Sequence, residues 1–139
     1  IFESLKAMKA KGIHIEITDL IVPKYGDSAE DAKALAEWIG NNLGPETPFH
    51  VLRFHPDYKL LDLPSTPIAS IERAVNVAKE VGLRYVYGGN VPGHSTENTY
   101  CPNCGDLLIE RWGFSVIRWN LTDEVKCPKC NMAIPIVVK

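Results

Sequence analysis

Apolar and polar residues follow two different periods along the chain, and the change of period marks the expected elements. Apolar residues recur at helical spacing over 2–11, 28–43 and 66–81, and a glycine follows each run. Three runs rich in β-branched and aromatic residues lie beside these helices, at 13–22, 49–54 and 83–89. The order helix, strand, helix, strand, helix, strand predicts parallel β/α units.

Local signals support two of these helices and suggest a larger parent fold. Ser28 with Asp31 forms a short capping box, and Thr66 followed by Pro67 is typical of an N-cap and the first helical position. Three strands are few for a free-standing parallel sheet, because its edges would be exposed. We therefore expect residues 1–97 to be the last part of a larger wound sheet or barrel. The chain opens inside a helical pattern, so we expect it to be part of a longer protein.

The four cysteines of the chain fall into two CxxC pairs, CPNCG at 101–105 and CPKCN at 127–131. Gly105 and Asn131 follow these pairs, and both residue types tolerate the left-handed backbone of a metal-binding turn. Two short strands are expected between the pairs, within a zinc-ribbon domain over 98–139. Four thiolates suit Zn²⁺ and leave no position for a catalytic water, so the ion would be structural. Rubredoxin-like iron, disulfides and unligated thiols are the alternatives. The predicted ligands are Cys101, Cys104, Cys127 and Cys130.

Composition narrows the classes of function. The 139 residues carry a net charge of -2 with no basic stripe, which argues against nucleic acid as a partner. No apolar run approaches the roughly 18 residues that span a bilayer, and the start lacks a secretion signal. We therefore expect a cytoplasmic protein without a membrane partner, in which the cysteines stay reduced.

Polar residues within the predicted strands suggest a ligand-binding interior. We predict that Arg53 and His55 share a face with His14, Glu16 and Thr18, and that Arg53 pairs with Glu16 or holds a ligand carboxylate. The alternative is an internal ion pair and a core imidazole at His14.

The carboxyl ends of the strands are the expected place for a site in such folds. We expect Thr18 with Asp19, residues 53–57 and residues 87–90 to surround one mouth. His94 is a further lining residue in a Gly- and Pro-rich linker at 88–99. The aromatic residues of the ribbon are instead expected in its core: Trp112, Phe114 and Trp119.

Three runs taken together carry a family resemblance: IEITDLIVPKYGDSAED, FHVLRFHPD, and GNVPGH leading into ENTYCPNCG. They resemble the AmmeMemoRadiSam-system radical SAM proteins, relatives of the pyruvate formate-lyase activating enzyme, over essentially the whole chain. The resemblance implies a partial TIM-type barrel with a [4Fe–4S] cluster that cleaves S-adenosylmethionine to a 5′-deoxyadenosyl radical. It also implies that His55 contacts S-adenosylmethionine and that Pro23 lies near its adenosine. Arg53 and Thr18 complete the residues expected around this cofactor.

The chain departs from that family at the cluster. The CxxxCxxC motif is absent, as is the Gly-rich segment that holds the methionine amino group. A missing N-terminal half of the barrel, from the same gene or a separate chain, would supply them, and a protein is one candidate substrate. Three functions stay open: the C-terminal part of a radical SAM enzyme, a stand-alone zinc-ribbon binding module, and a rubredoxin-like electron carrier.

Overall fold

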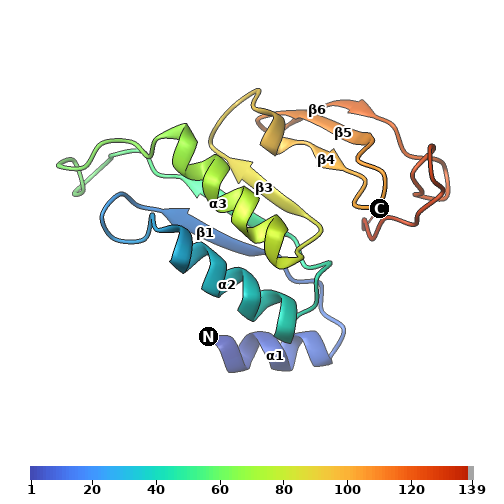
Figure 1. Ribbon diagram of the computed structural model, residues 1–139, viewed down its shortest axis with the longest axis horizontal. Coiled ribbons are helices and arrows are strands. Elements are labelled where there is room, and N and C mark those ends of the chain that lie inside the picture. The colour runs from blue at the N-terminus through green and yellow to red at the C-terminus, as the bar shows by residue number, and fades with distance from the viewer. Residues whose placement is uncertain (138–139) are drawn as a thin grey trace.

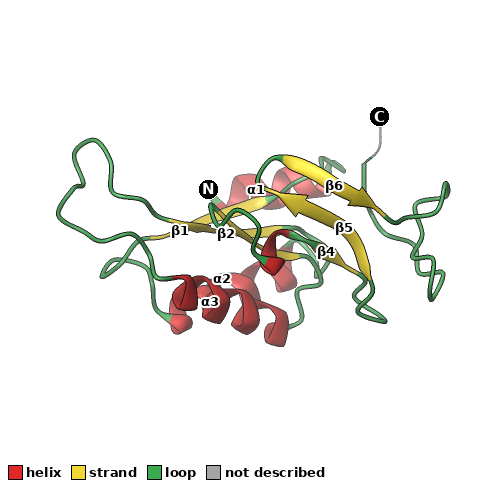
Figure 2. Cartoon of the chain, turned by 90° about the horizontal axis from the view of Figure 1, so that it is seen from above, coloured by secondary structure: helices red, strands yellow, loops and turns green. Residues whose placement is uncertain are grey.

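The computed structural model describes residues 1–137, which form two three-stranded sheets (Figures 1 and 2). The first sheet is parallel, with the strand order β1-β2-β3. Each strand follows a helix, so the predicted alternation of helices and strands is confirmed. The elements of this part are α1 (Phe2–Ala10), β1 (Ile17–Ile21), α2 (Ala29–Asn42), β2 (Phe49–Arg53), α3 (Ile68–Val81) and β3 (Val86–Gly89).

Helices α2 and α3 lie side by side on one face of the parallel sheet (Figure 2). Their apolar stripes meet alternate strand residues in the main core, where Phe49 and Val51 are completely buried. Helix α1 packs beside α2, with the rings of Phe2 and Trp38 4.3 Å apart (Figure 1). No helix covers the opposite face of the sheet within the described residues, and we call it the open face.

The register of β1 and β2 corrects one predicted surface. Thr18 lies opposite His50, and Ile21 lies opposite Arg53. Because paired residues point to the same face of a sheet, Glu16 and Thr18 share the open face with His50. Arg53 shares the helix-covered face with buried Ile21. Arg53 and Glu16 therefore point to opposite faces of the sheet. The predictions that they form a pair and share a face are wrong, because the register differs by one residue from the one assumed.

Thr66 has a different role from the predicted N-cap. Helix α3 begins at Ile68 with Pro67 in the N-cap position, one residue later than expected. The Thr66 hydroxyl is completely buried; it donates to the Ile21 carbonyl at 2.5 Å and accepts from the Phe54 N–H at 3.0 Å. One side chain thus links the carboxyl ends of β1 and β2.

The predicted cap of α2 is confirmed. Ser28 occupies the N-cap position, and its hydroxyl oxygen accepts from the Asp31 N–H at 3.0 Å. No helix within residues 1–137 has the length and apolar character needed to cross a membrane. The two longest, α2 and α3, have 14 residues each.

The second sheet is antiparallel and follows directly on β3. A short 3₁₀ turn, η1 (Ser95–Glu97), leads into β4 (Thr99–Tyr100), β5 (Leu107–Trp112) and β6 (Ser115–Trp119). The two predicted strands between the cysteine pairs are confirmed, whereas the predicted linker contains η1 and the start of β4. Hydrogen bonds cross the proposed boundary at residue 97, and the division into two domains stays a prediction.

The prediction that the hairpin aromatics form a core is wrong. Trp112, Phe114 and Trp119 are all exposed, and every residue of β6 is exposed as well. The physical reason is that β6 is an edge strand, and that Phe114 and Trp119 face a cavity rather than packed side chains.

Asp19 gives a prediction about pH and stability. Its side chain shares the helix-covered face, where burial, and then the charge of Asp31, raise its pKa above the ordinary 3.8. A carboxyl group with a higher pKa in the folded state favours folding while it is protonated, below about pH 4. This contribution to the free energy of unfolding is lost as the pH rises through the folded-state pKa. Asp19→Asn is therefore expected to gain stability at pH 7 and none at pH 3. The gain should be about 0.5 kcal/mol, because solvent screens the half-exposed group. Thermal melting at both pH values, with exposed Asp123→Asn as control, measures it; a variant less stable than wild type at pH 7 contradicts it.

Candidate metal centre and the adjacent cavity

The four cysteines of the chain converge on one point. Their Sγ atoms all lie within 4.8 Å of one another. The Cys101 and Cys130 sulfurs are 3.5 Å apart, and the Cys104 and Cys127 sulfurs are 3.6 Å apart. A disulfide needs about 2.05 Å, so these thiols are free. The group can hold a metal ion.

Each CxxC pair lies in a tight turn with the same backbone hydrogen bonds. The Gly105 N–H donates to the Cys101 carbonyl at 2.9 Å, and the Asn131 N–H donates to the Cys127 carbonyl at 2.8 Å. Gly105 and Asn131 have φ values of 76° and 61°, which confirms the predicted left-handed positions. Each turn therefore directs two sulfurs to the same side.

The metal-free thiols differ in acidity. The pKa of Cys130 is lowered to about 6, first by a hydrogen bond from the Asn103 side chain and then by the Met132 backbone. The pKa of Cys104 is raised to about 12: the Asp106 backbone lowers it, but burial and the other three thiols outweigh that effect. A bound cation would take up the sulfurs as thiolates and release their protons.

The cysteine group also packs against the parallel sheet. Its apolar surroundings include Leu108 and Ile109 of β5, Ile134, and Tyr85 at the start of β3. Burial raises the pKa of Tyr85 to about 12, and its buried hydroxyl has no hydrogen-bond partner among the described residues. The metal centre and β3 therefore share one small core.

A cavity of about 730 Å³ separates the open face of the parallel sheet from the β5–β6 hairpin. We call it the inter-sheet cavity; its volume is in the range of small-molecule sites. Glu16, His50 and Tyr87 line it from the sheet, and Arg111 and Trp119 line it from the hairpin. Figure 2 shows the hairpin on the side of the sheet away from α2 and α3.

Glu16 is the centre of a polar group on the open face. One carboxylate oxygen is 3.0 Å from Nε2 of His14, and the other is 2.6 Å from Nε2 of His50. The hydrogen bond with His14 lowers the pKa of Glu16, burial opposes this, and His50 lowers it further. Glu16 is therefore a carboxylate at neutral pH. The His50 ring stacks on Tyr87, with centroids 5.2 Å apart.

Two polar groups, the buried Glu97 and the part-buried Arg111, fix the hairpin beside the sheet. The Glu97 carboxylate accepts from the N–H groups of Gly93 and Gly113, at 3.0 and 3.1 Å. The Arg111 guanidinium donates to the Glu97 carbonyl and the Thr99 hydroxyl, and lies 5.5 Å from the centre of the Tyr87 ring. Sequence reasoning missed Glu97 and Arg111, because no local motif marks either.

The residues predicted around S-adenosylmethionine do not line this cavity. Pro23, Arg53 and His55 lie at the carboxyl ends of β1 and β2. Thr18 is on the open face near the start of β1. The Arg53 Nε donates to the Thr66 carbonyl at 2.8 Å, and the His55 side chain is exposed. Their binding role stays a prediction.

Two further predicted lining residues differ in their surroundings. Asn90 lines the inter-sheet cavity, and its Nδ2 donates to the Arg53 carbonyl at 3.0 Å. His94 instead caps η1, and its Nε2 lies 3.2 Å from Glu72. We therefore expect a structural role for His94.

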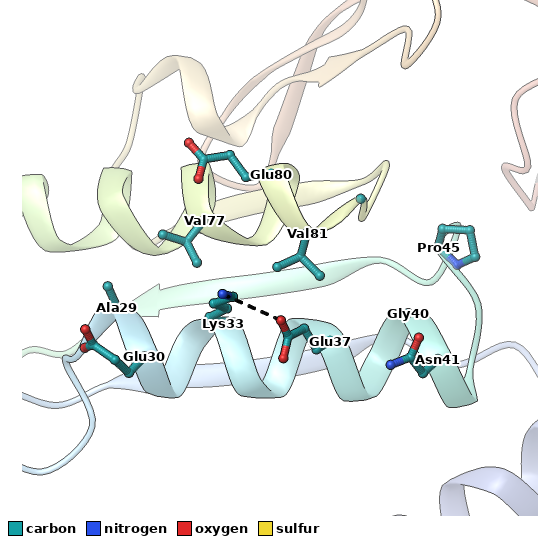
Figure 3. Close-up of a pocket in the computed structure, with 11 residues that line it drawn as sticks. Ala29, Glu30, Lys33, Glu37, Gly40, Asn41, Pro45, Val77, Glu80 and Val81 are labelled. Atoms are coloured by element: carbon teal, nitrogen blue, oxygen red, sulfur yellow. Dashed lines mark ion pairs between the residues drawn. The ribbon is translucent and has the colours of Figure 1, made fainter.

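A second hollow, of about 740 Å³, lies between α2 and α3 on the outer side of the molecule (Figure 3). Its residues belong to two helix surfaces, where Lys33 and Glu37 form an ion pair at 3.8 Å. Val77 and Val81 of α3 lie above this pair. These features are those of a solvated helix surface and not of a binding site. The candidate sites are therefore the open face and the cysteine group.

Comparison with known proteins gives one extensive similarity. No family model matches the chain. The chain is 52% identical over 139 residues to a protein of Methanocaldococcus jannaschii titled "Uncharacterized protein MJ0808". The alignment covers 99% of this chain and 42% of that protein. The chain therefore spans less than half the length of this relative.

Proposed function

We propose that this chain is the C-terminal part of a radical SAM enzyme similar to the glycyl-radical activating enzymes, with a structural zinc ribbon. The observation that carries the proposal is the one-sided covering of the parallel sheet: helices lie on one face, and the other face is open and polar. In barrel enzymes the helices cover the outside of the strands while the site lies at their carboxyl ends.

The metal part of the proposal follows from the donor set. Four sulfurs from two similar turns fit a tetrahedral Zn²⁺ site, and four thiolates leave no position for a substrate or water. The ion would hold β4, β5 and the segment around Cys127 together and perform no chemistry.

The four cysteines do not fit a second role as ligands of a [4Fe–4S] cluster. All of them belong to one group, and the chain has no other thiol. We infer that a missing N-terminal half supplies the cluster, which with S-adenosylmethionine would give the 5′-deoxyadenosyl radical. The part of this chain would be to bind and orient S-adenosylmethionine, with His55 as a hydrogen-bond donor and Pro23 as an apolar contact.

The proposal predicts a CxxxCxxC segment upstream of residue 1, or in a neighbouring gene. A complete protein containing it, reconstituted with iron and sulfide, should form 5′-deoxyadenosine from S-adenosylmethionine and dithionite. His55→Ala should weaken S-adenosylmethionine binding about tenfold by calorimetry, through loss of a hydrogen bond to a charged ligand. Its zinc content should not change. The matched control is His14→Ala, at the opposite end of the sheet. Absence of 5′-deoxyadenosine, or equal affinity of both variants, contradicts the proposal.

The exposed hairpin favours a second candidate, a stand-alone binding module. Trp112, Phe114 and Ile117 have exposed fractions of 62%, 109% and 61%, and large exposed apolar side chains on one hairpin are a feature of protein interfaces. A start codon at residue 1 in the gene, with no cluster motif in a partner gene, would favour this module over the enzyme.

A further inference from the structure

We propose that the inter-sheet cavity binds a small organic cation with an aromatic or apolar body. The proposal stands on the cavity itself, and its test needs neither the cluster nor S-adenosylmethionine. Three properties carry it: a carboxylate with no permanent counter-ion, exposed aromatic rings from the hairpin across the cavity, and an excess of carboxylates over guanidinium groups in the lining.

The charges around the cavity leave one carboxylate without a permanent counter-ion. Three carboxylates line it, at Glu16, Glu46 and Glu97, against the single guanidinium of Arg111. Glu46 is paired with Arg84 at 2.9 Å. Glu97 accepts two backbone N–H groups next to Arg111. Glu16 therefore carries the free negative charge of the cavity.

Neither side chain that contacts Glu16 is a permanent cation. Both are imidazoles, those of His14 and His50. No Lys or Arg of residues 1–137 lies within ion-pair distance of Glu16. The two histidines hold the carboxylate in place, and each of its oxygens keeps a lone pair for a further donor.

One nitrogen of Arg111 is engaged within the protein. Its Nη1 donates to Glu97 and Thr99 at 3.1 and 2.7 Å, and the guanidinium lies over the Tyr87 ring. An anionic ligand would meet the Glu16 charge, with this partly engaged guanidinium as the one permanent cation that lines the cavity. Three carboxylates against one guanidinium make the electrostatics of the cavity more favourable to cations than to anions.

The opposite wall of the cavity suits the apolar body of the ligand. Phe114, Val116 and Trp119 line it from the hairpin, Ile136 adds to this wall, and Leu52 of β2 is an apolar residue of the facing sheet. The Phe114 ring is fully exposed and Trp119 is 47% exposed, so both rings are available to a ligand. Aromatic faces attract cations, which makes the two walls complementary to one organic ammonium ion.

The test is a nuclear magnetic resonance titration of the zinc-loaded 139-residue chain at pH 7.5 with two matched probes. Phenethylamine carries the cation, and 3-phenylpropionate carries an anion on a similar apolar body. The cation should bind at least about tenfold more tightly, because it replaces repulsion from Glu16 by attraction. Its shifts should centre on Glu16, His50 and the Trp119 indole N–H. Equal binding of the two probes, or shifts elsewhere, would overturn the proposal.

Variants separate the two walls of the cavity. Glu16→Gln should weaken phenethylamine binding about fivefold, whereas Glu30→Gln on the exposed surface of α2 should not. Trp119→Ala should weaken it to a similar degree, whereas Trp112→Ala should not, because Trp112 does not line the cavity. The spectrum of each variant reports whether it is folded. Equal effects within either pair of variants would contradict the site.

Discussion

Cys127→Ser is expected to abolish stoichiometric zinc binding and to unfold residues 99–137 while α2, α3 and the parallel sheet stay folded. Cys127 is completely buried within the small core that it shares with Leu108 and Ile109. Structural zinc supplies about 10–16 kcal/mol in zinc-finger peptides, and a segment of this size has little core of its own. Metal analysis gives the zinc content, and backbone resonances of β5 against those of α3 show which part unfolds.

The control for this prediction is a change in the same turn that removes no ligand. Pro128 is exposed and adjacent to Cys127, so Pro128→Ala should keep one zinc per chain. The wild-type protein should be colourless, because Zn²⁺ has no visible absorption. A red ferric-thiolate spectrum would instead indicate the rubredoxin-like alternative. One zinc retained in Cys127→Ser, with β5 still folded, would show that the ion is not the main support of this segment.

The cysteine group and the order of elements are predictable because their signals are local. Each CxxC turn depends on about five consecutive residues, and Gly105 and Asn131 mark the left-handed positions by residue type alone. The alternation of helices and strands likewise follows from short periodic runs, and Ser28 begins its helix where a capping residue should. The interactions at these positions lie within one turn or one helix, so the rest of the fold does not change them.

The register between strands is not a local property, and here the predictions were wrong. Whether Arg53 shares a face with Glu16 depends on a shift of one residue between β1 and β2, which neither strand determines by itself. The role of Thr66 is not a local property either. Its residue type, followed by a proline, is typical of an N-cap, but its hydroxyl bonds to the ends of two strands. The burial of Trp119 depends on whether another layer covers β6, and its own residue type cannot show that.

The inter-sheet cavity depends on contacts between distant residues. Glu16 and His50 are 34 residues apart, and Glu97 accepts from Gly113 at a separation of 16. No spacing rule relates such pairs, because the turns and helices between them set their distance. The cavity becomes visible only once the second sheet is placed beside the open face.

Thr66→Val should cost about 2–4 kcal/mol of unfolding free energy. Valine nearly preserves the shape of threonine but removes the hydroxyl, so the Ile21 carbonyl and the Phe54 N–H both lose this partner in a buried place. Each unsatisfied buried group costs about 1–3 kcal/mol. Urea unfolding followed by far-ultraviolet circular dichroism measures the loss.

Two matched variants show that the hydroxyl, and not the volume of the side chain, carries this effect. Thr66→Ser keeps the oxygen that joins β1 to β2 and removes a methyl group, so its cost should stay near 1 kcal/mol. Thr18→Val makes the same chemical change on the open face, where Thr18 is exposed, and should change stability by about 0.5 kcal/mol or less. If Thr66→Ser were as destabilising as Thr66→Val, packing around the methyl group would be the main contribution. The backbone hydrogen bonds between β1 and β2, and not the Thr66 hydroxyl, would then hold the two strand ends together.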